Sequence, residues 1–154
     1  MSGLYEIYVD GACSGNPGAA GIGVVINAQG KTVKEISKPI GEATNNIAEY
    51  SALIYALQEA LVMKAAEVKV YTDSELMFRQ VTGAYKVKNE KLKFLLDQVR
   101  HLMAGFKHID LCHVRREKNK QADKLATGAI REKQAKMVAP LFENIGEESP
   151  SSVG

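Results

Sequence analysis

Several features that mark special classes of protein are scarce or missing in this sequence. There are only two cysteines, Cys13 and Cys112, which are too few for a disulfide framework and have no metal-ligand spacing. No apolar run approaches the length of a transmembrane helix, and the N-terminal stretch MSGLYEIYVDG lacks the apolar segment of a signal peptide. The net charge of +2 is too small to indicate a nucleic-acid partner by itself. We therefore expect a cytoplasmic protein without a membrane partner.

The composition that remains is that of one ordinary globular domain. The chain has 154 residues, of which 45% are hydrophobic and 25% charged, enough for a substantial core. We expect residues 1–139 to form this domain. The residues after Pro140 are small, polar and acidic, so 140–154 are predicted to be a flexible tail. Nothing in the sequence indicates an obligate protein partner.

The first forty residues have the pattern of three β-strands. Tyr5, Ile7 and Val9 alternate with other side chains in a run that we expect to end at Asp10. Two further strand-like runs, 22–27 and 31–40, are separated by the turn sequence Ala-Gln-Gly. This arrangement predicts a three-stranded antiparallel meander.

The rest of the chain alternates between helical and strand patterns. Apolar residues recur at spacings of three and four from Ile47 to Leu61, which predicts an amphipathic helix. The expected order is βββαβααβα, a mixed sheet that carries helices. The elements expected after the meander are helices at 46–64, 74–82, 89–104 and 119–138, and strands in EVKVYTDS and at 108–114.

Four acidic residues fall near the ends of these predicted elements. Asp10 ends the first strand and Asp73 ends the fourth. Glu49 and Asp123 lie in the first turns of the first and last long helices. Taken singly, each acid has a structural interpretation. These are a hairpin turn at Asp10, a capping box of Asn46 with Glu49, a helix cap at Asp73-Ser74, and a favourable helix dipole at Asp123, with Asn119 as the cap.

Taken together, the acids indicate a metal site. A crossover from the first strand to the fourth makes them parallel neighbours, so their carboxyl ends meet at one edge of the sheet. Clustered carboxylates repel one another and are tolerated when divalent cations bind between them. Mg²⁺ prefers oxygen ligands, and two such ions about 3.5–4 Å apart can promote phosphodiester hydrolysis. No Cys/His pairs suggest zinc instead.

Four motifs on these elements resemble ribonuclease H type 1, over roughly residues 4 to 135. They are DGACSGNPG, TNNIAEY, YTDSE and NKQADKLA, in this order. The resemblance implies an α/β ribonuclease H-like fold, with a five-stranded mixed sheet of three antiparallel and then two parallel strands and helices on both faces. The sequence resembles a short form of the family, because it lacks the basic, aromatic-rich protrusion that some relatives carry.

The resemblance also implies an activity, the endonucleolytic hydrolysis of the RNA strand of RNA/DNA hybrids. The products would carry 3′-hydroxyl and 5′-phosphate ends. Two Mg²⁺ ions, or Mn²⁺ in their place, would be held by Asp10, Glu49, Asp73 and Asp123. The alternative is a catalytically weak nucleic-acid-binding module that keeps the fold. The four carboxylates argue against this alternative, because a simple binder gains nothing from negative charge near phosphate.

Polar residues in the first two motifs match the family's minor-groove contacts. Asn16, Asn45 and Asn46 resemble its minor-groove readers, with Cys13 and Thr44 beside them. Side-chain amides both donate and accept hydrogen bonds, so they can address 2′-hydroxyls and base edges in a wide, shallow groove. Helix capping by Asn45 and Asn46 is compatible with this role.

The match is imperfect after the last strand. Many family members carry a catalytic histidine in a flexible loop there, and His113 lies ten residues before Asp123. The glycine-rich loop expected after that histidine is missing, so His113 is either catalytic or directed into a packed face. Arg115 or Arg116 is then expected to supply positive charge to the phosphate instead.

The match is also imperfect after the second predicted helix. Tyr85 either stacks against a deoxyribose of the DNA strand or is a half-buried tyrosine at a helix junction. Lys86 and Lys88 either contact phosphates or belong to a solvated face.

Overall fold

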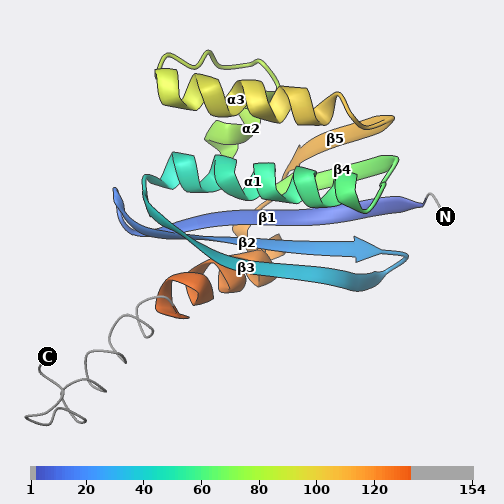
Figure 1. Cartoon of the computed structure of the whole chain (residues 1–154), viewed down its shortest axis with the longest axis horizontal. Coiled ribbons are helices and arrows are strands. Elements are labelled where there is room, and N and C mark those ends of the chain that lie inside the picture. Colours follow the sequence, from blue (N-terminus) through green and yellow to red (C-terminus); the bar gives the residue numbers. More distant parts are fainter. Residues whose placement is uncertain (1–2, 133–154) are drawn as a thin grey trace, which may run out of the picture.

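A five-stranded sheet with helices on both faces forms the molecule (Figure 1). The structure, a computed structural model, describes residues 3–132. The strands are β1 (Leu4–Gly15), β2 (Gly18–Ala28), β3 (Lys31–Ala43), β4 (Glu67–Thr72) and β5 (His108–His113). The helices are α1 (Asn45–Val62), α2 (Glu75–Val81), α3 (Glu90–Met103), the short 3₁₀ helix η1 (Arg116–Lys118) and a last helix that is described over 120–132.

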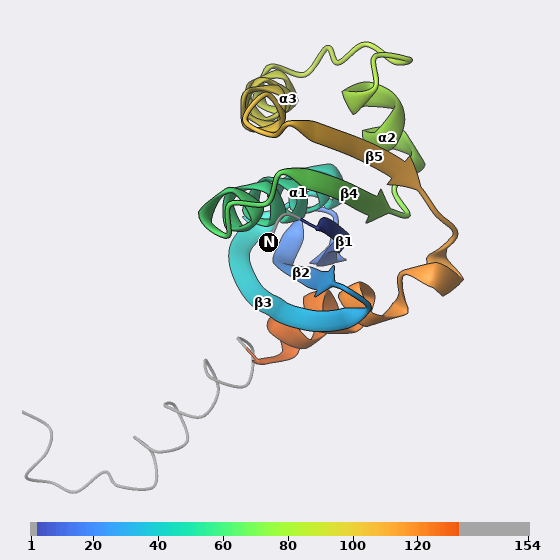
Figure 2. The same ribbon diagram turned by 90° about the vertical axis from the view of Figure 1, so that its right-hand side faces the viewer.

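The predicted fold class is confirmed. The strands lie in the order β3-β2-β1-β4-β5. β1, β2 and β3 pair antiparallel, whereas β4 pairs parallel to β1 and β5 parallel to β4. Helices α1, α2 and α3 cover one face of the sheet, and the last helix lies on the other face (Figures 1 and 2).

The predicted end of the first strand at Asp10 is wrong. β1 continues to Gly15 and stays paired with β2, from Asp10 opposite Gly23 to Gly15 opposite Gly18. Small residues fill this stretch, and the chain reverses only at Asn16-Pro17. What ends near Asp10 is the pairing of β1 with β4, whose last pair is Val9 with Thr72. β2 and β3 are longer than predicted for the same reason, because small residues there disguise the strand pattern.

The main core lies between the sheet and the three helices above it. Buried aliphatic residues of β1, β2 and β4 pack against the buried face of α1, which includes Leu53 and Leu57. Tyr50 of α1 is fully buried, and its hydroxyl donates a 2.7 Å hydrogen bond to Gln80 Oε1 of α2. This pairing satisfies a buried polar group, which would otherwise destabilise the core. The core therefore fixes α1 and α2 against the sheet.

The last helix packs on β2 through glycines. A Cβ atom on Gly23 would lie 2.0 Å from the Ala122 carbonyl oxygen, and one on Gly21 would lie 2.6 Å from that of Ala126. Only glycine allows backbone to approach backbone this closely. The helix is predicted to extend to residue 138, and its part beyond 132 lies outside the described residues, as do the domain boundary at 139 and the tail at 140–154. No helix within 3–132 is long and apolar enough to cross a membrane.

We predict that Gly23→Ala destabilises the protein by at least about 2 kcal/mol, because the helix backbone must move to admit the methyl group. The matched control is Gly128→Ala, within the last helix, where an added Cβ meets nothing within 4 Å. That control should be neutral or stabilising, since alanine favours helix. Urea unfolding of the two variants measures the difference, and equal stabilities would contradict this account of the packing.

Candidate metal centre and nucleic-acid interface

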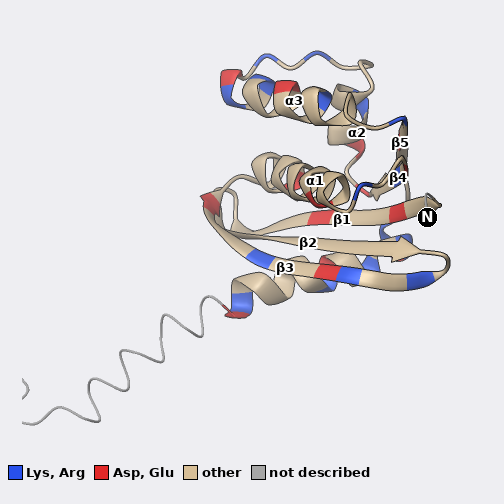
Figure 3. Ribbon diagram, turned by 45° about the vertical axis from the view of Figure 1, so that its right-hand side comes forward, with Lys and Arg blue, Asp and Glu red and all other residues tan. Residues whose placement is uncertain are grey.

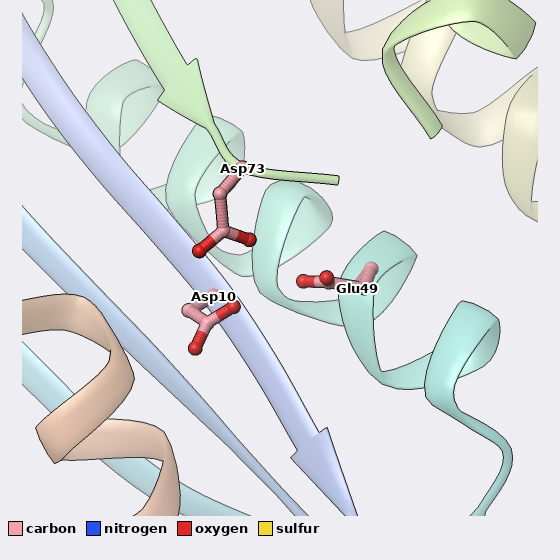
Figure 4. A group of neighbouring side chains, drawn as sticks. All are labelled: Asp10, Glu49 and Asp73. Atoms are coloured by element: carbon pink, nitrogen blue, oxygen red, sulfur yellow. The ribbon is translucent and has the colours of Figure 1, made fainter. Parts of the chain in front are cut away.

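Three carboxylates meet where β1 runs on beyond the end of β4. Their groups each offer an oxygen within 4.8 Å of the others, in Asp10, Glu49 and Asp73 (Figure 4). Asp10 is only 5% exposed, in the middle of β1. Because β4 stops at Thr72, no strand pairs with that flank of β1 beyond Val9. Acids from β1, from α1 and from the residue after β4 therefore converge there.

Glu49 is held by the close approach of α1 to β1. A Cβ atom on Gly11 would lie 2.3 Å from the carbonyl carbon of Ala48, so only glycine fits at this crossing. The Gly11 N–H donates a 2.7 Å hydrogen bond to Glu49 Oε1. The predicted capping box of Asn46 with Glu49 is wrong, because Thr44 is the N-cap and its hydroxyl accepts from the Ile47 N–H. The carboxylate of Glu49 faces the other acids (Figure 4).

The carboxylate of Asp73 does not cap α2, because the neighbouring Ser74 does so. Ser74 caps α2 and accepts a hydrogen bond from the Met77 N–H. The Ser74 N–H donates to Thr72 Oγ1 at the end of β4. The predicted cap at Asp73-Ser74 is therefore formed by the serine, and the aspartate carboxylate belongs to the cluster.

Asp123 approaches the cluster from the opposite face of the sheet. It lies in the first turn of the last helix, is exposed, and contributes to the raised pKa of Asp10. The group of carboxylates within 4.8 Å of one another does not include it, so the structure brings together three of the four predicted acids. Asn119 directly precedes this helix and is 1% exposed. Its amide nitrogen donates a 2.8 Å bond to the Val9 carbonyl, and its Oδ1 has no partner among the described residues. Asn119 thus ties the helix start to β1 beside Asp10, and its side chain does not cap the helix as predicted.

The electrostatics of the cluster are unfavourable without a cation. Burial raises the pKa of Asp10, and the negative charges of Glu49 and Asp73 raise it further. Burial also raises the pKa of Glu49, although the Gly11 N–H and the charge of Arg116 oppose this shift. Among the described residues, no lysine or arginine forms an ion pair with these three acids. An oxygen-only donor set of this kind fits a hard divalent cation such as Mg²⁺.

A polar hollow lies beside the N-terminus of α1. It has a volume of about 630 Å³, and its lining includes all three predicted minor-groove residues and Thr44. The Asn16 Oδ1 accepts a 2.9 Å hydrogen bond from the backbone N–H of Asn45, and the Cys13 thiol donates a 2.9 Å bond to Asn45 Oδ1. The structure therefore brings the β1–β2 turn and the start of α1 together, whereas a contact of these residues with nucleic acid stays a prediction.

The residues predicted after α2 and β5 lie on exposed segments. Basic residues line the loop between α2 and α3 (Figure 3), including Lys86 and Lys88, which are exposed. Tyr85 is 50% exposed, and the Arg79 guanidinium lies 5.6 Å from the centre of its ring. Arg115 and Arg116 are exposed as well. Of these, Arg116 acts on the cluster through its charge on Glu49.

His113 lies at the end of β5, opposite Thr72 of β4. Its ring stacks on Phe78 of α2, with 5.8 Å between the ring centres. The side chain is exposed and lies outside the group of three converging carboxylates. A catalytic role for His113 stays a prediction.

The sequence patterns did not predict the roles of three residues in and around the site. Gly11 looks like a turn residue and is instead a donor to Glu49. Asn119 looks like a helix cap and is instead a link to β1. Asn89 caps α3 through its contact with the Leu92 N–H and also lines the polar hollow, together with Lys91. The N-cap position of Asn89 is visible in the sequence, but its distance from Asn45 is not.

We predict that the metal-free protein loses stability as the pH rises from about 5 to 8. The folded-state pKa values of Asp10 and Glu49 are raised, so the folded state retains protons that the unfolded chain releases near pH 4. Asp10→Asn removes one of the repelling charges. It should flatten this dependence and raise Tm at pH 8 by at least about 2–4 °C, the equivalent of about 1 kcal/mol for a chain of this size.

Thermal unfolding followed by circular dichroism in chelator, at several pH values, measures this effect. Asp110→Asn is the matched control, since Asp110 is an exposed acid in β5. An equal pH dependence in the Asp10→Asn variant and the wild type would contradict the prediction.

Comparison with known proteins agrees with this geometry. A family model described as reverse transcriptase-like matches residues 8–129. The chain is 40% identical over 129 residues to ribonuclease HI of Halobacterium salinarum, covering 83% of this chain and 65% of that protein. A bifunctional protein of Mycobacterium tuberculosis is 40% identical over 152 residues, covering 96% of this chain but only 42% of that protein. The chain thus spans less than two thirds of the length of these relatives.

Solved structures show the same fold. A crystal structure of RNase H1 from Halobacterium salinarum is 39% identical, with a TM-score of 0.82, and the match covers 84% of this chain and 99% of that one. LC11-RNase H1, solved in complex with an RNA/DNA hybrid, is 44% identical, with a TM-score of 0.79 and the same coverage. These matches and the converging acids lead to one conclusion. The chain belongs to the ribonuclease H family, type 1.

Proposed function

We propose that this protein is an endonuclease that hydrolyses the RNA strand of RNA/DNA hybrids. The observation that carries the proposal is the convergence of Asp10, Glu49 and Asp73 within 4.8 Å, with Asp123 near enough to raise the pKa of Asp10. Burying like charges together lowers stability, so such a cluster indicates a site that works with bound cations. The similarity to LC11-RNase H1, which was solved with a hybrid, supports the choice of substrate.

The four acids would hold two Mg²⁺ ions, with Mn²⁺ as a possible substitute. When bound, the ions supply Lewis-acid activation of a water and neutralise charge on the leaving oxygen. Asp10 is central in this arrangement, because acids that come from both faces of the sheet raise its pKa. The proposed reaction is in-line attack of water on phosphorus with departure of the 3′-oxygen, which leaves 5′-phosphate and 3′-hydroxyl ends.

Other residues of the chain would position the hybrid. Asn16, Asn45 and Asn46 line the hollow at the start of α1, where their amides suit the minor groove with its 2′-hydroxyls. Thr44 and Cys13 lie beside them. Exposed cations outside the cluster would bind the phosphate backbone and make binding salt-dependent. The candidates are Lys86, Lys88 and Arg115, with the half-exposed Tyr85 available to stack on a sugar.

Cleavage of a labelled RNA/DNA hybrid tests the proposal. We expect cleavage in Mg²⁺ or Mn²⁺, none in chelator, and none of single-stranded or duplex RNA. Asp10→Asn should lower kcat by at least about 100-fold while the protein stays folded, because the site loses its central charge. If the product accepts label from a kinase only after phosphatase treatment, its 5′ end carries phosphate.

Two results would overturn the nuclease assignment. Hybrid binding without cleavage in either metal would favour a binding module that keeps the fold. Equal cleavage by wild type and Asp10→Asn would show that another site, or a contaminant, performs the reaction. The exposed-acid variant Asp110→Asn should cleave like the wild type.

Arg116 is proposed to supply positive charge near the scissile phosphate. It is exposed at the start of η1, and its positive charge acts to lower the pKa of Glu49. Arg116→Ala should lower kcat/KM by about 10- to 100-fold, the equivalent of one charge-assisted hydrogen bond. Arg116→Lys should retain part of the activity. Arg131→Ala, which removes an exposed arginine from the far end of the last helix, is the control, and an equal loss in both alanine variants would contradict the assignment.

A further inference from the structure

Two hydrogen bonds join Asn45 to the β1–β2 hairpin, one through its backbone and one through its side chain. Its backbone N–H donates to Asn16 Oδ1 at 2.9 Å, and its side-chain Oδ1 accepts from the Cys13 thiol at 2.9 Å. These residues are 29 and 32 positions away in the sequence. Asn45 is exposed and is the first residue of α1.

Cys13 is itself well fixed. It lies in β1 opposite Ala20, and it packs on a small apolar cluster of Ala20, Ala43 and Ala48. Burial raises the pKa of its thiol, so the sulfur keeps its proton at neutral pH and can donate. A thiol is a weak acceptor, so its contact with an amide favours the oxygen of that amide over the nitrogen.

The same reasoning applies to Asn16. Its Oδ1 is occupied by the Asn45 backbone N–H, which leaves its NH₂ group for other partners. Asn16 and Asn45 both line the polar hollow. Because each amide oxygen already accepts a hydrogen bond within the protein, the NH₂ groups are favoured over the oxygens for contact with a ligand.

We propose that Cys13 is a positioning residue that holds the Asn45 amide with its oxygen inward and its NH₂ group toward the substrate. The inference rests on the proposed function, in which Asn45 contacts the hybrid. It specifies the direction of that contact: the Asn45 NH₂ group donates, and the nucleic acid accepts. Ribose 2′-oxygens, pyrimidine O2 atoms and purine N3 atoms are the acceptors that a minor groove offers.

Removal of the Cys13 thiol should free the Asn45 side chain to rotate while leaving that side chain in place. In Cys13→Ala, Asn45 can rotate, and part of its population would present oxygen to an acceptor. Cys13→Ser keeps a donor at this position. We expect affinity for the hybrid, relative to a DNA duplex of the same sequence, to fall about 2- to 10-fold in Cys13→Ala. It should stay within about 2-fold of the wild type in Cys13→Ser.

Binding is best measured by fluorescence anisotropy in an Asp10→Asn background, which does not require cleavage. Cys112→Ala is the matched control, because Cys112 is a half-buried cysteine in β5 outside the hollow. A double-mutant cycle with Asn45→Ala tests the coupling directly. The effect of Cys13→Ala should vanish once Asn45 is alanine, whereas a general packing defect would persist. In the active protein, Cys13→Ala should raise KM and leave kcat within 2-fold.

A readout on the free protein separates this inference from the proposed function. The side-chain ¹⁵N amide resonance of Asn45 should shift in Cys13→Ala and remain near its original position in Cys13→Ser and Cys112→Ala. An unmoved resonance, additive effects in the cycle, or equal losses in the serine and alanine variants would each overturn the positioning role. If the Asn45 resonance shifts but the protein binds the hybrid no better than a DNA duplex, the positioning role of Cys13 stands. The proposed function is then overturned.

Discussion

The close approach of α1 to β1 at Gly11 is the constraint on which the site depends. At this crossing there is no room for a side chain on the strand, so the helix backbone lies directly against it. That contact lets a strand N–H reach Glu49 and bring its carboxylate beside Asp10. It also sets the first turn of α1 against the β1–β2 hairpin, where Asn45 meets Asn16 and Cys13. Acids and amides are thus placed by one helix crossing.

The carboxylate cluster is maintained at a cost to folding. Each buried charge loses hydration and repels its neighbours, and a protein selected only for stability would replace these acids. The surrounding structure tolerates them because α1 and the last helix are anchored elsewhere, by the Tyr50–Gln80 bond and by the packing of the last helix on Gly23. Stability in the core therefore offsets instability at the site, a pattern common in enzymes.

The sequence was sufficient to predict the fold class and the element order, because hydrophobic periodicity is a local property. Of the four acids predicted to converge, Asp10, Glu49 and Asp73 lie within 4.8 Å of one another and Asp123 lies outside that group. The length of β1 was not predictable in this way, since Gly11 and Gly15 read as turn residues when their partner strand is unknown. The role of Asn119 was hidden for a related reason. Its partner, Val9, is 110 residues away, and a buried amide before a helix looks like a cap until the contact is seen.

The last helix packs on the face of the sheet opposite α1, yet its Asp123 contributes to the raised pKa of Asp10. The proposed four-acid metal site would therefore be complete only when both layers have docked on the sheet. During synthesis, a ribosome-bound chain that has not yet released the segment around Asp123 lacks one of the four acids. A partly made or clipped chain that lacks the segment around Asp123 would resemble the mature fold on one face of the sheet. It would still lack this carboxylate. The order of the elements along the chain would thus delay the proposed activity until helices cover both faces of the sheet.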